Sequence, residues 1–241
     1  MKPLFLALST LTLFPLPVKK WTSSQLKDSV VFYPWVGALL GGVLALANWV
    51  PFFRDLHALM ILLLWVALTL AFHLDGLADC LDGWLGGKNP SERRRIMKDA
   101  ALGVYGAVGI VLLLLSKYVL LEHLLIKTDA WKWLIALPAL ARWSAVVSCW
   151  RSSSPNKDRG LASRVLGLSF TKFLLSTLFV LALVPLMEWE ILWGLLICAA
   201  VSRVVSAISR DRIGGLTGDG LGATIELSEW ALLFLACLRF I

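Results

Sequence analysis

Long apolar stretches are the feature that most restricts how this 241-residue chain can fold. Only 16% of the residues are charged, whereas a soluble domain carries about 25%. A helix needs about 20 apolar residues to cross a bilayer, and lipid leaves no partner for unpaired backbone groups. We therefore expect an all-α fold, a polytopic integral membrane helix bundle. Seven stretches of about the required length are candidate spans, namely about 29–50, 56–73, 102–121, 131–150, 168–187, 189–208 and 224–241.

The segment before the first span, MKPLFLALSTLTLFPLPVKK, is short for a crossing helix because it holds only about 14 apolar positions and is broken by Pro15 and Pro17. It has no small-x-small cleavage site, so we interpret it as an interfacial or re-entrant piece of the mature protein. We find no internal repeat, so residues 1–241 are expected to form a single membrane-embedded domain. The scattered cysteines contain no CxxC pair, which argues against a disulfide or zinc framework.

The distribution of Lys and Arg predicts the orientation of the bundle. If the loops alternate between the two sides, one set carries fourteen basic residues, namely Lys19, Lys20, Lys27, Lys88, Arg93, Arg94, Arg95, Lys98, Arg151, Lys157, Arg159, Arg164, Arg210 and Arg212. The other set carries three, namely Arg54, Lys127 and Lys132. Basic loops face the cytoplasm, so the first set should lie on that side. The net charge of +7 thus points to the lipid bilayer as a partner and not to nucleic acid.

The stretch AFHLDGLADCLDGWLGG places three aspartates at the end of an apolar run. In a helix, Asp79 and Asp82 lie at about 40° and about −20° from Asp75, so the three carboxylates share a face. They repel one another unless a cation sits among them, and Mg²⁺ takes such oxygen ligands together with substrate phosphates. The alternative is a solvated acidic loop. His73 could bind a phosphate or a metal, or could be an interfacial histidine.

The next polar segment, NPSERRRIMKDAALGVYG, combines a dense positive patch with Asp99. Cations such as Arg94 and Lys98 can hold phosphates while an acid holds a metal, as phosphoryl transfer requires. A loop that touches anionic lipid would explain most of the basic residues, but it would not explain Asp99.

Two further segments carry polar groups at membrane depth. Arg142 lies about eight residues, or about 12 Å, inside the fourth span and needs a partner such as a carboxylate or phosphate. The segment RDRIGGLTGDGLGATIELSE holds Thr217 and Asp219 in a glycine-rich loop, followed by Glu226 in the last helix. Such a loop before a helix can offer backbone amides to phosphate. Because isolated charges in a membrane are costly, we expect Asp99, Arg142, Asp219 and Glu226 to converge with the aspartate face on one cavity.

Taken together, HLDGLADCLDGWLGG, RRRIMKDAALGVYG, ARWSAVV and GGLTGDGLGATIELSE resemble, in order, the signature segments of the cobalamin synthase family, the adenosylcobinamide-GDP ribazoletransferases. The family consists of Mg²⁺-dependent transferases of the late cobalamin pathway. The resemblance implies that α-ribazole, or its 5′-phosphate, is joined to adenosylcobinamide-GDP while GMP leaves. It also implies a bacterial cytoplasmic (inner) membrane, a site that faces the cytoplasm, and possible association with copies of the chain or with other late cobalamin-pathway enzymes.

The family's functional positions carry over to Asp75, Asp79, Asp82, Asp99, Arg142, Asp219 and Glu226, whereas His73, Arg94, Lys98 and Thr217 are candidates from the residue chemistry described above. The expected catalytic and metal-binding residues are Asp75, Asp79, Asp82 and Asp99. The expected substrate-binding residues are His73, Arg94, Lys98, Arg142, Thr217, Asp219 and Glu226. One carboxylate could serve as general base for a ribazole hydroxyl. The chain departs from the family pattern at Cys80, where a small polar residue is frequent, and at TLFPLP, where an arginine frequently precedes the prolines.

Two other interpretations remain open at this point. A CDP-alcohol phosphotransferase also uses aspartates and a metal at the membrane surface, but its DGxxAR pattern is absent. A transporter would line a path with intramembrane charges, but transporters usually show repeats and midplane charges on several helices. Here the polar residues crowd the expected cytoplasmic ends, which favours an enzyme at the membrane surface.

Overall fold

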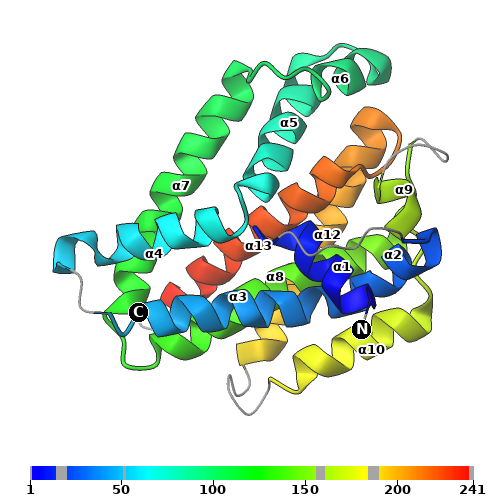
Figure 1. Ribbon diagram of the computed structural model, residues 1–241. Helices are drawn as coiled ribbons and strands as arrows, with labels where there is room; N and C mark the ends of the chain where they lie inside the picture. Colours follow the sequence, from blue (N-terminus) through cyan, green and yellow to red (C-terminus); the bar gives the residue numbers. More distant parts are fainter. Residues whose placement is uncertain (1, 15–20, 51–52, 156–160, 184–189, 239–241) are drawn as a thin grey trace.

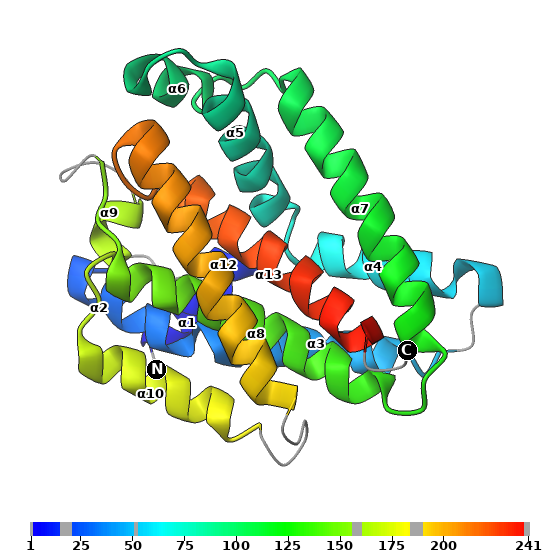
Figure 2. The ribbon, with the colours of Figure 1, turned by 180° about the vertical axis from the view of Figure 1, so that it is seen from behind.

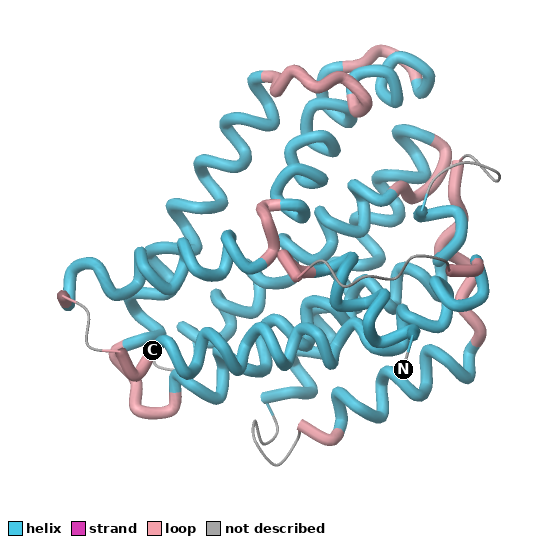
Figure 3. The backbone as a smooth tube through the Cα atoms, viewed as in Figure 1, coloured by secondary structure: helices cyan, strands magenta, loops and turns pink. Residues whose placement is uncertain are grey.

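The computed structural model describes residues 2–14, 21–50, 53–155, 161–183 and 190–238 (Figure 1). In these ranges every regular element is a helix, which confirms the all-α expectation (Figure 3). In chain order the elements are α1 (Lys2–Leu11), α2 (Ser23–Ser29), the 3₁₀ turn η1 (Val30–Phe32), α3 (Tyr33–Ala47), α4 (Arg54–Leu68), α5 (Phe72–Gly86), α6 (Pro90–Ile96), α7 (Val104–Leu125), α8 (Ala130–Arg151), α9 (Leu161–Val165), α10 (Phe170–Leu181), α12 (Glu190–Ile213) and α13 (Gly218–Leu238).

Five helical segments in the described part of the chain are long and apolar enough to cross a membrane. They are Ser23–Ala47, which joins α2, η1 and α3, and the helices α7, α8, α12 and α13. A sixth span results if α4 and α5 are counted together, although they meet at a bend of 84°. The sequence predicted about seven spans. The stretch 168–187 accounts for the difference, because α10 has 12 residues and reaches only about 18 Å; residues 184–189 lie outside the described part.

Helix α8 is the most buried of these five segments and forms the centre of the bundle. Helix α3 packs along it, and two glycines allow this close approach. A Cβ atom on Gly37 would lie 2.2 Å from the carbonyl oxygen of Pro138, and one on Gly41 would lie 2.3 Å from that of Leu134. Small residues at helix interfaces are how membrane helices gain packing contacts in lipid.

Helix α13 packs against α5, α7, α8 and α12, as both views of the ribbon show (Figures 1 and 2). Serine pairs tie α8 to its neighbours. Ser148 is hydrogen-bonded to Ser202 of α12 at 2.8 Å, and Ser228 of α13 donates to Ser144 at 2.9 Å. Hydrogen bonds of this kind join helices where no water competes.

The chain breaks between α4 and α5 without glycine or proline. Leu70 and Ala71 both adopt the left-handed conformation, with φ values of 51° and 54°. This conformation costs roughly 1–2 kcal/mol for each non-glycine residue, so tertiary contacts must hold it. One such contact comes from the N-terminal segment, where the backbone amide of Leu13 donates to the carbonyl of Leu68 at 2.9 Å.

The N-terminal segment forms the short helix α1, which packs against α2 and α3. Pro15 and Pro17, on which the sequence interpretation of this segment partly rested, lie outside the described residues.

The segments expected on the cytoplasmic side lie at one end of the molecule. Helices α6 and α9 and the turn between α12 and α13 lie toward this end, opposite the turn between α7 and α8 (Figure 1). Four charges used to predict the orientation, Lys19, Lys20, Lys157 and Arg159, also lie outside the described part.

Candidate active site

A cavity of about 930 Å³ opens where the N-terminal segment, the break before α5 and the start of α13 meet. The break exposes Thr69, Leu70, Phe72 and His73 to it, and the start of α13 contributes Thr217, Gly218 and Asp219. Lys98 also lies on its wall. Four of the residues predicted from the sequence therefore line one cavity, namely His73, Lys98, Thr217 and Asp219.

The acids of α5 meet Asp219 beside this cavity because α5 and the start of α13 cross closely. A Cβ atom on Gly76 would lie 2.9 Å from the carbonyl oxygen of Asp219, so only glycine permits the approach. Asp79 is half-buried and interacts electrostatically with Asp75, Asp82 and Asp219. Asp75 itself is exposed. We refer to Asp75, Asp79 and Asp219 as the acidic edge of the cavity.

A hydroxyl group fixes the loop that carries Asp219. Thr217 Oγ1 donates to Asp219 Oδ2 at 3.4 Å and accepts a hydrogen bond from the backbone amide of Gly220 at 3.2 Å. Thr217 thus serves as a side-chain cap for the first turn of α13 while it orients the acid.

Asp82 has a different environment from the other acids of α5. Its carboxylate is buried and accepts hydrogen bonds from the backbone amides of Gly103 and Gly106, both at 2.8 Å. These amides lie at the N-terminus of α7, where unpaired N–H groups and the helix dipole favour a negative charge. Asp82 therefore caps α7. Each oxygen of Asp82 thus accepts one backbone hydrogen bond, which distinguishes Asp82 from Asp75 and Asp79, and the metal-ligand role expected for all three stays a prediction.

The residues present fit a magnesium ion at the acidic edge only in part. Among the residues that the structure describes, no three Asp, Glu, His or Cys side chains form a ready-made metal site. Mg²⁺ is usually held by one or two carboxylates, and water and substrate phosphates complete its shell. Asp75, Asp79 and Asp219 can supply such oxygens, and their mutual repulsion favours a cation among them.

The residues of the basic patch have two kinds of environment: Lys98 lines the cavity, whereas Arg93 and Arg94 contact the backbone of α12. Arg94 Nη1 donates to the carbonyl of Ile213 at 2.7 Å, and Arg93 Nη1 donates to that of Arg212 at 3.3 Å. These carbonyls belong to the last turn of α12, where cations satisfy free C=O groups. Arg94 thus anchors α6 to α12, in contrast to the substrate contact predicted from the sequence. Asp99 is exposed, and its carboxylate accepts a hydrogen bond from the amide of Ala101 at 3.1 Å.

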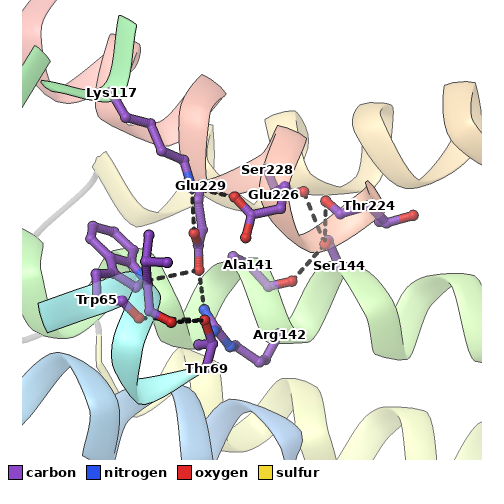
Figure 4. A network of polar contacts seen from close by, with 11 residues as sticks. Trp65, Thr69, Lys117, Ala141, Arg142, Ser144, Thr224, Glu226, Ser228 and Glu229 are labelled. Atoms are coloured by element: carbon purple, nitrogen blue, oxygen red, sulfur yellow. Dashed lines mark hydrogen bonds and ion pairs between the residues drawn. The ribbon is translucent and has the colours of Figure 1, made fainter. Parts of the chain in front are cut away.

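A second polar cluster lies buried between α7, α8 and α13 (Figure 4). Lys117 Nζ lies 2.5 Å from Glu226 Oε2 and 2.7 Å from Glu229 Oε2. Arg142 Nη1 pairs with Glu229 Oε1, which also accepts a hydrogen bond from Trp65 Nε1 at 3.2 Å. Two cations thus balance two carboxylates, as burial of charge requires. We call Lys117, Arg142, Glu226 and Glu229 the buried ion cluster.

The buried ion cluster corrects the expectation of one shared cavity. Arg142 and Glu226 were predicted to bind substrate beside the aspartates, but the structure pairs them with Glu229 and Lys117. Neither is among the described residues that line the cavity. Lys117 and Glu229 were given no role from the sequence, although a lysine inside the apolar run VGIVLLLLSKYVLLEHLL is a clear signal of a buried partner.

His73 lies between the cavity and the buried ion cluster. It lines the cavity and interacts electrostatically with Arg142, Glu229 and Lys117 of the buried ion cluster. The residue is 2% exposed, and neither ring nitrogen has a hydrogen-bond partner among the described residues. An unpaired buried donor or acceptor is costly, which makes the ring available to a ligand.

Comparison with known proteins assigns this architecture to a family. A family model described as cobalamin-5-phosphate synthase matches residues 3–237. The chain belongs to the cobalamin-5-phosphate synthase family. It is 36% identical over 247 residues to the adenosylcobinamide-GDP ribazoletransferase of Acinetobacter baumannii (strain ACICU), covering 97% of this chain and 96% of that protein.

Other members of the cobalamin-5-phosphate synthase family are similarly related. The enzyme of the same name from Prosthecochloris aestuarii is 34% identical over 231 residues, 92% of each chain. That from Pseudomonas syringae pv. syringae is 36% identical over 243 residues, covering 97% of this chain and 98% of the relative. No solved structure matches the chain. The family resemblance seen in the four sequence segments is thus confirmed over nearly the full length.

Proposed function

We propose that this chain is an adenosylcobinamide-GDP ribazoletransferase that acts at the cytoplasmic face of a bacterial inner membrane. It joins α-ribazole, or its 5′-phosphate, to the corrinoid phosphate of adenosylcobinamide-GDP and releases GMP. Family membership and the names of the relatives support this reaction. The structural observation that carries the proposal is the acidic edge, where Asp219 of α13 meets Asp75 and Asp79 of α5 beside a large cavity.

The acidic edge suits the displacement at phosphorus. An oxygen of the acceptor forms a new bond to the phosphorus that carries the cobinamide, and the bond from this phosphorus to the bridging oxygen breaks. GMP leaves with that oxygen. When free α-ribazole is the acceptor, a carboxylate of the acidic edge takes the proton of its hydroxyl. Asp219, which lies on the cavity wall and is oriented by Thr217, is placed to do so.

The diphosphate needs compensation for its negative charge. Asp75 and Asp79 would hold a Mg²⁺ ion, which would neutralise the diphosphate and the departing GMP, while Asp219 stays free to take the proton. Lys98 contributes a positive charge on the cavity wall, where it can attract a phosphate of either substrate. The buried ion cluster and the cap on α7 hold α5, α7, α8 and α13 in the arrangement that forms the acidic edge.

The orientation follows from the charge distribution. Lys88, Arg93, Arg94 and Lys98 lie near the acidic edge in the chain, and basic loops remain in the cytoplasm. The activity is tested with purified protein in nanodiscs supplied with adenosylcobinamide-GDP, α-ribazole and Mg²⁺. GMP should appear only when both organic substrates are present. Release of GMP without α-ribazole at the full rate would indicate a hydrolase and contradict the proposal.

A further inference from the structure

The two substrates of the proposed reaction differ greatly in size, and this difference bears on the cavity. The donor carries a corrin macrocycle and a GDP group, whereas the acceptor is a single aromatic nucleoside. The cavity has about 930 Å³, near the upper end of the roughly 300–1,000 Å³ that drug-sized ligands occupy. It is therefore ample for the acceptor and restrictive for the donor.

The walls of the cavity combine apolar and hydroxyl-bearing side chains. Leu11, Leu26, Phe72, Leu221 and Ile225 are among the apolar residues. Hydroxyl groups come from Ser9, Thr10, Thr12, Tyr33, Thr69, Ser154 and Thr217. Apolar walls bind a flat aromatic base, and hydroxyl groups exchange hydrogen bonds with a sugar. This composition matches a nucleoside with an apolar base.

The charges on the wall distinguish between the substrates. Among the described lining residues, Asp219 is the only acid and Lys98 the only cation, apart from the titratable ring of His73. Asp219 is itself surrounded by the negative charge of Asp75 and Asp79. A neutral nucleoside enters such a site without repulsion, and its hydroxyl can donate to the carboxylate. A diphosphate at the same depth would meet the like charge of the acidic edge, with Lys98 as the single wall cation to offset it.

His73 supplies the unsatisfied polar group that such a ligand would meet. The strained break at Leu70 and Ala71 ends directly before Phe72 and His73, and both of these residues line the cavity. Strained backbone that persists in a fold concentrates at ligand sites. The ring of His73 is buried and has no hydrogen-bond partner in the described part of the protein, so a ligand group in the cavity would be its partner.

We infer that this cavity is the binding site of the aromatic nucleoside acceptor, with His73 as a ligand-binding residue and the ribose directed toward Asp219. The donor then reaches the acidic edge from outside the cavity. The inference rests on the proposed function and assigns one of its two substrates to a defined place.

The test fills the cavity without disturbing the fold. A Cβ atom on Gly218, which lines the cavity, meets no atom within 4 Å, so Gly218→Phe adds a ring into open space. Gly42 of α3 is equally unobstructed and lies outside the cavity lining, so Gly42→Phe is the matched control. Binding of α-ribazole alone is measured by titration calorimetry in nanodiscs, and KM for adenosylcobinamide-GDP is measured separately.

We expect Gly218→Phe to weaken α-ribazole binding at least tenfold while KM for adenosylcobinamide-GDP changes less than twofold, and Gly42→Phe to change neither. His73→Phe keeps a ring and removes no hydrogen bond made within the described protein. It should weaken α-ribazole binding by about tenfold without lowering the melting temperature. If the wild-type protein is active and Gly218→Phe instead raises KM for the corrinoid, or alters neither substrate, the assignment of the cavity is wrong. If the wild-type protein forms no GMP with both substrates, the proposed function itself fails.

Discussion

The carboxylate of Asp82 on α5 accepts a hydrogen bond from the backbone amide of Gly103, 2.8 Å away, at the residue that precedes α7. Together with the bond from Gly106, this contact gives Asp82 a structural role that Asp75 and Asp79 of the same acidic stretch do not have. The three aspartates should therefore respond differently to substitution.

We predict that Asp82→Ala destabilises the protein by about 2–4 kcal/mol, because two amides lose a charged acceptor in a buried site. Gly106→Ala should act through the same contact, since a Cβ atom there would lie 2.5 Å from Asp82 Oδ2. Melting temperatures in detergent measure both effects. Gly42→Ala is the control, because a Cβ atom on Gly42 meets nothing within 4 Å. Unchanged melting temperatures for both variants would show that the contact of Asp82 with the start of α7 does not stabilise the protein.

Asp79→Asn should lower kcat by about 100-fold or more, as expected when one group that stabilises transition-state charge is lost. It should also raise the Mg²⁺ concentration needed for half-maximal rate. The melting temperature should stay constant or rise, because the substitution removes one of several repelling charges. Asp211→Asn, whose side chain is 79% exposed, is the control for a lost surface charge. Wild-type turnover of Asp79→Asn across a Mg²⁺ titration would show that the acidic edge is not catalytic.

The buried ion cluster predicts that Arg142 supports the fold and does not bind the substrate phosphate. Arg142→Lys keeps the charge but alters the contact with Glu229, so the melting temperature should fall while KM for adenosylcobinamide-GDP stays the same. Lys117→Met should cost about 3–5 kcal/mol, since two carboxylates lose their shared cation. Adding Glu226→Gln to Lys117→Met should restore part of this loss. An increased KM for Arg142→Lys at constant melting temperature would favour the phosphate contact instead.

The orientation can be measured by labelling with an impermeant maleimide after Cys80, Cys149, Cys198 and Cys237 are replaced. Trp49→Cys lies on an exposed turn after α3, and Lys88→Cys lies on the exposed turn after α5. Cells with a permeabilised outer membrane should be labelled at position 49 only, and inverted vesicles at position 88 only. Labelling of position 88 from the periplasmic side would place the acidic edge on the wrong face.

The sequence predicted the helical fold and the long spans because a stretch of about 20 apolar residues in lipid must pair its own backbone N–H and C=O groups, and a helix does so. It did not predict the break at Leu70 and Ala71. The local sequence VALTLAFHL contains neither glycine nor proline, and the left-handed conformation depends on contacts such as that of Leu13 with Leu68. The same long-range contact brings the N-terminal segment to the cavity, where its Ser9, Thr10 and Thr12 would not be expected from their own sequence context.

The site was predictable where its residues are close in sequence, and less so where partners come from afar. Helical geometry correctly placed Asp75 and Asp79 on one helix, but the role of Asp82 depends on the start of α7, more than twenty residues away. Arg142 was correctly expected to need a partner at its depth. That partner is Glu229, a residue 87 positions later. A single sequence does not show whether a buried arginine pairs with such a distant carboxylate or with a substrate phosphate.

Transfer of the corrinoid phosphate to the nucleoside fixes the ratio of the two products, and this ratio can be measured. Purified protein in nanodiscs is incubated with adenosylcobinamide-GDP, α-ribazole and Mg²⁺, and the products are quantified by mass spectrometry. We expect one GMP for each adenosylcobalamin formed, with both products lost in Asp79→Asn. GMP accompanied by adenosylcobinamide phosphate in place of adenosylcobalamin, or the absence of both products from the wild-type protein, would contradict it.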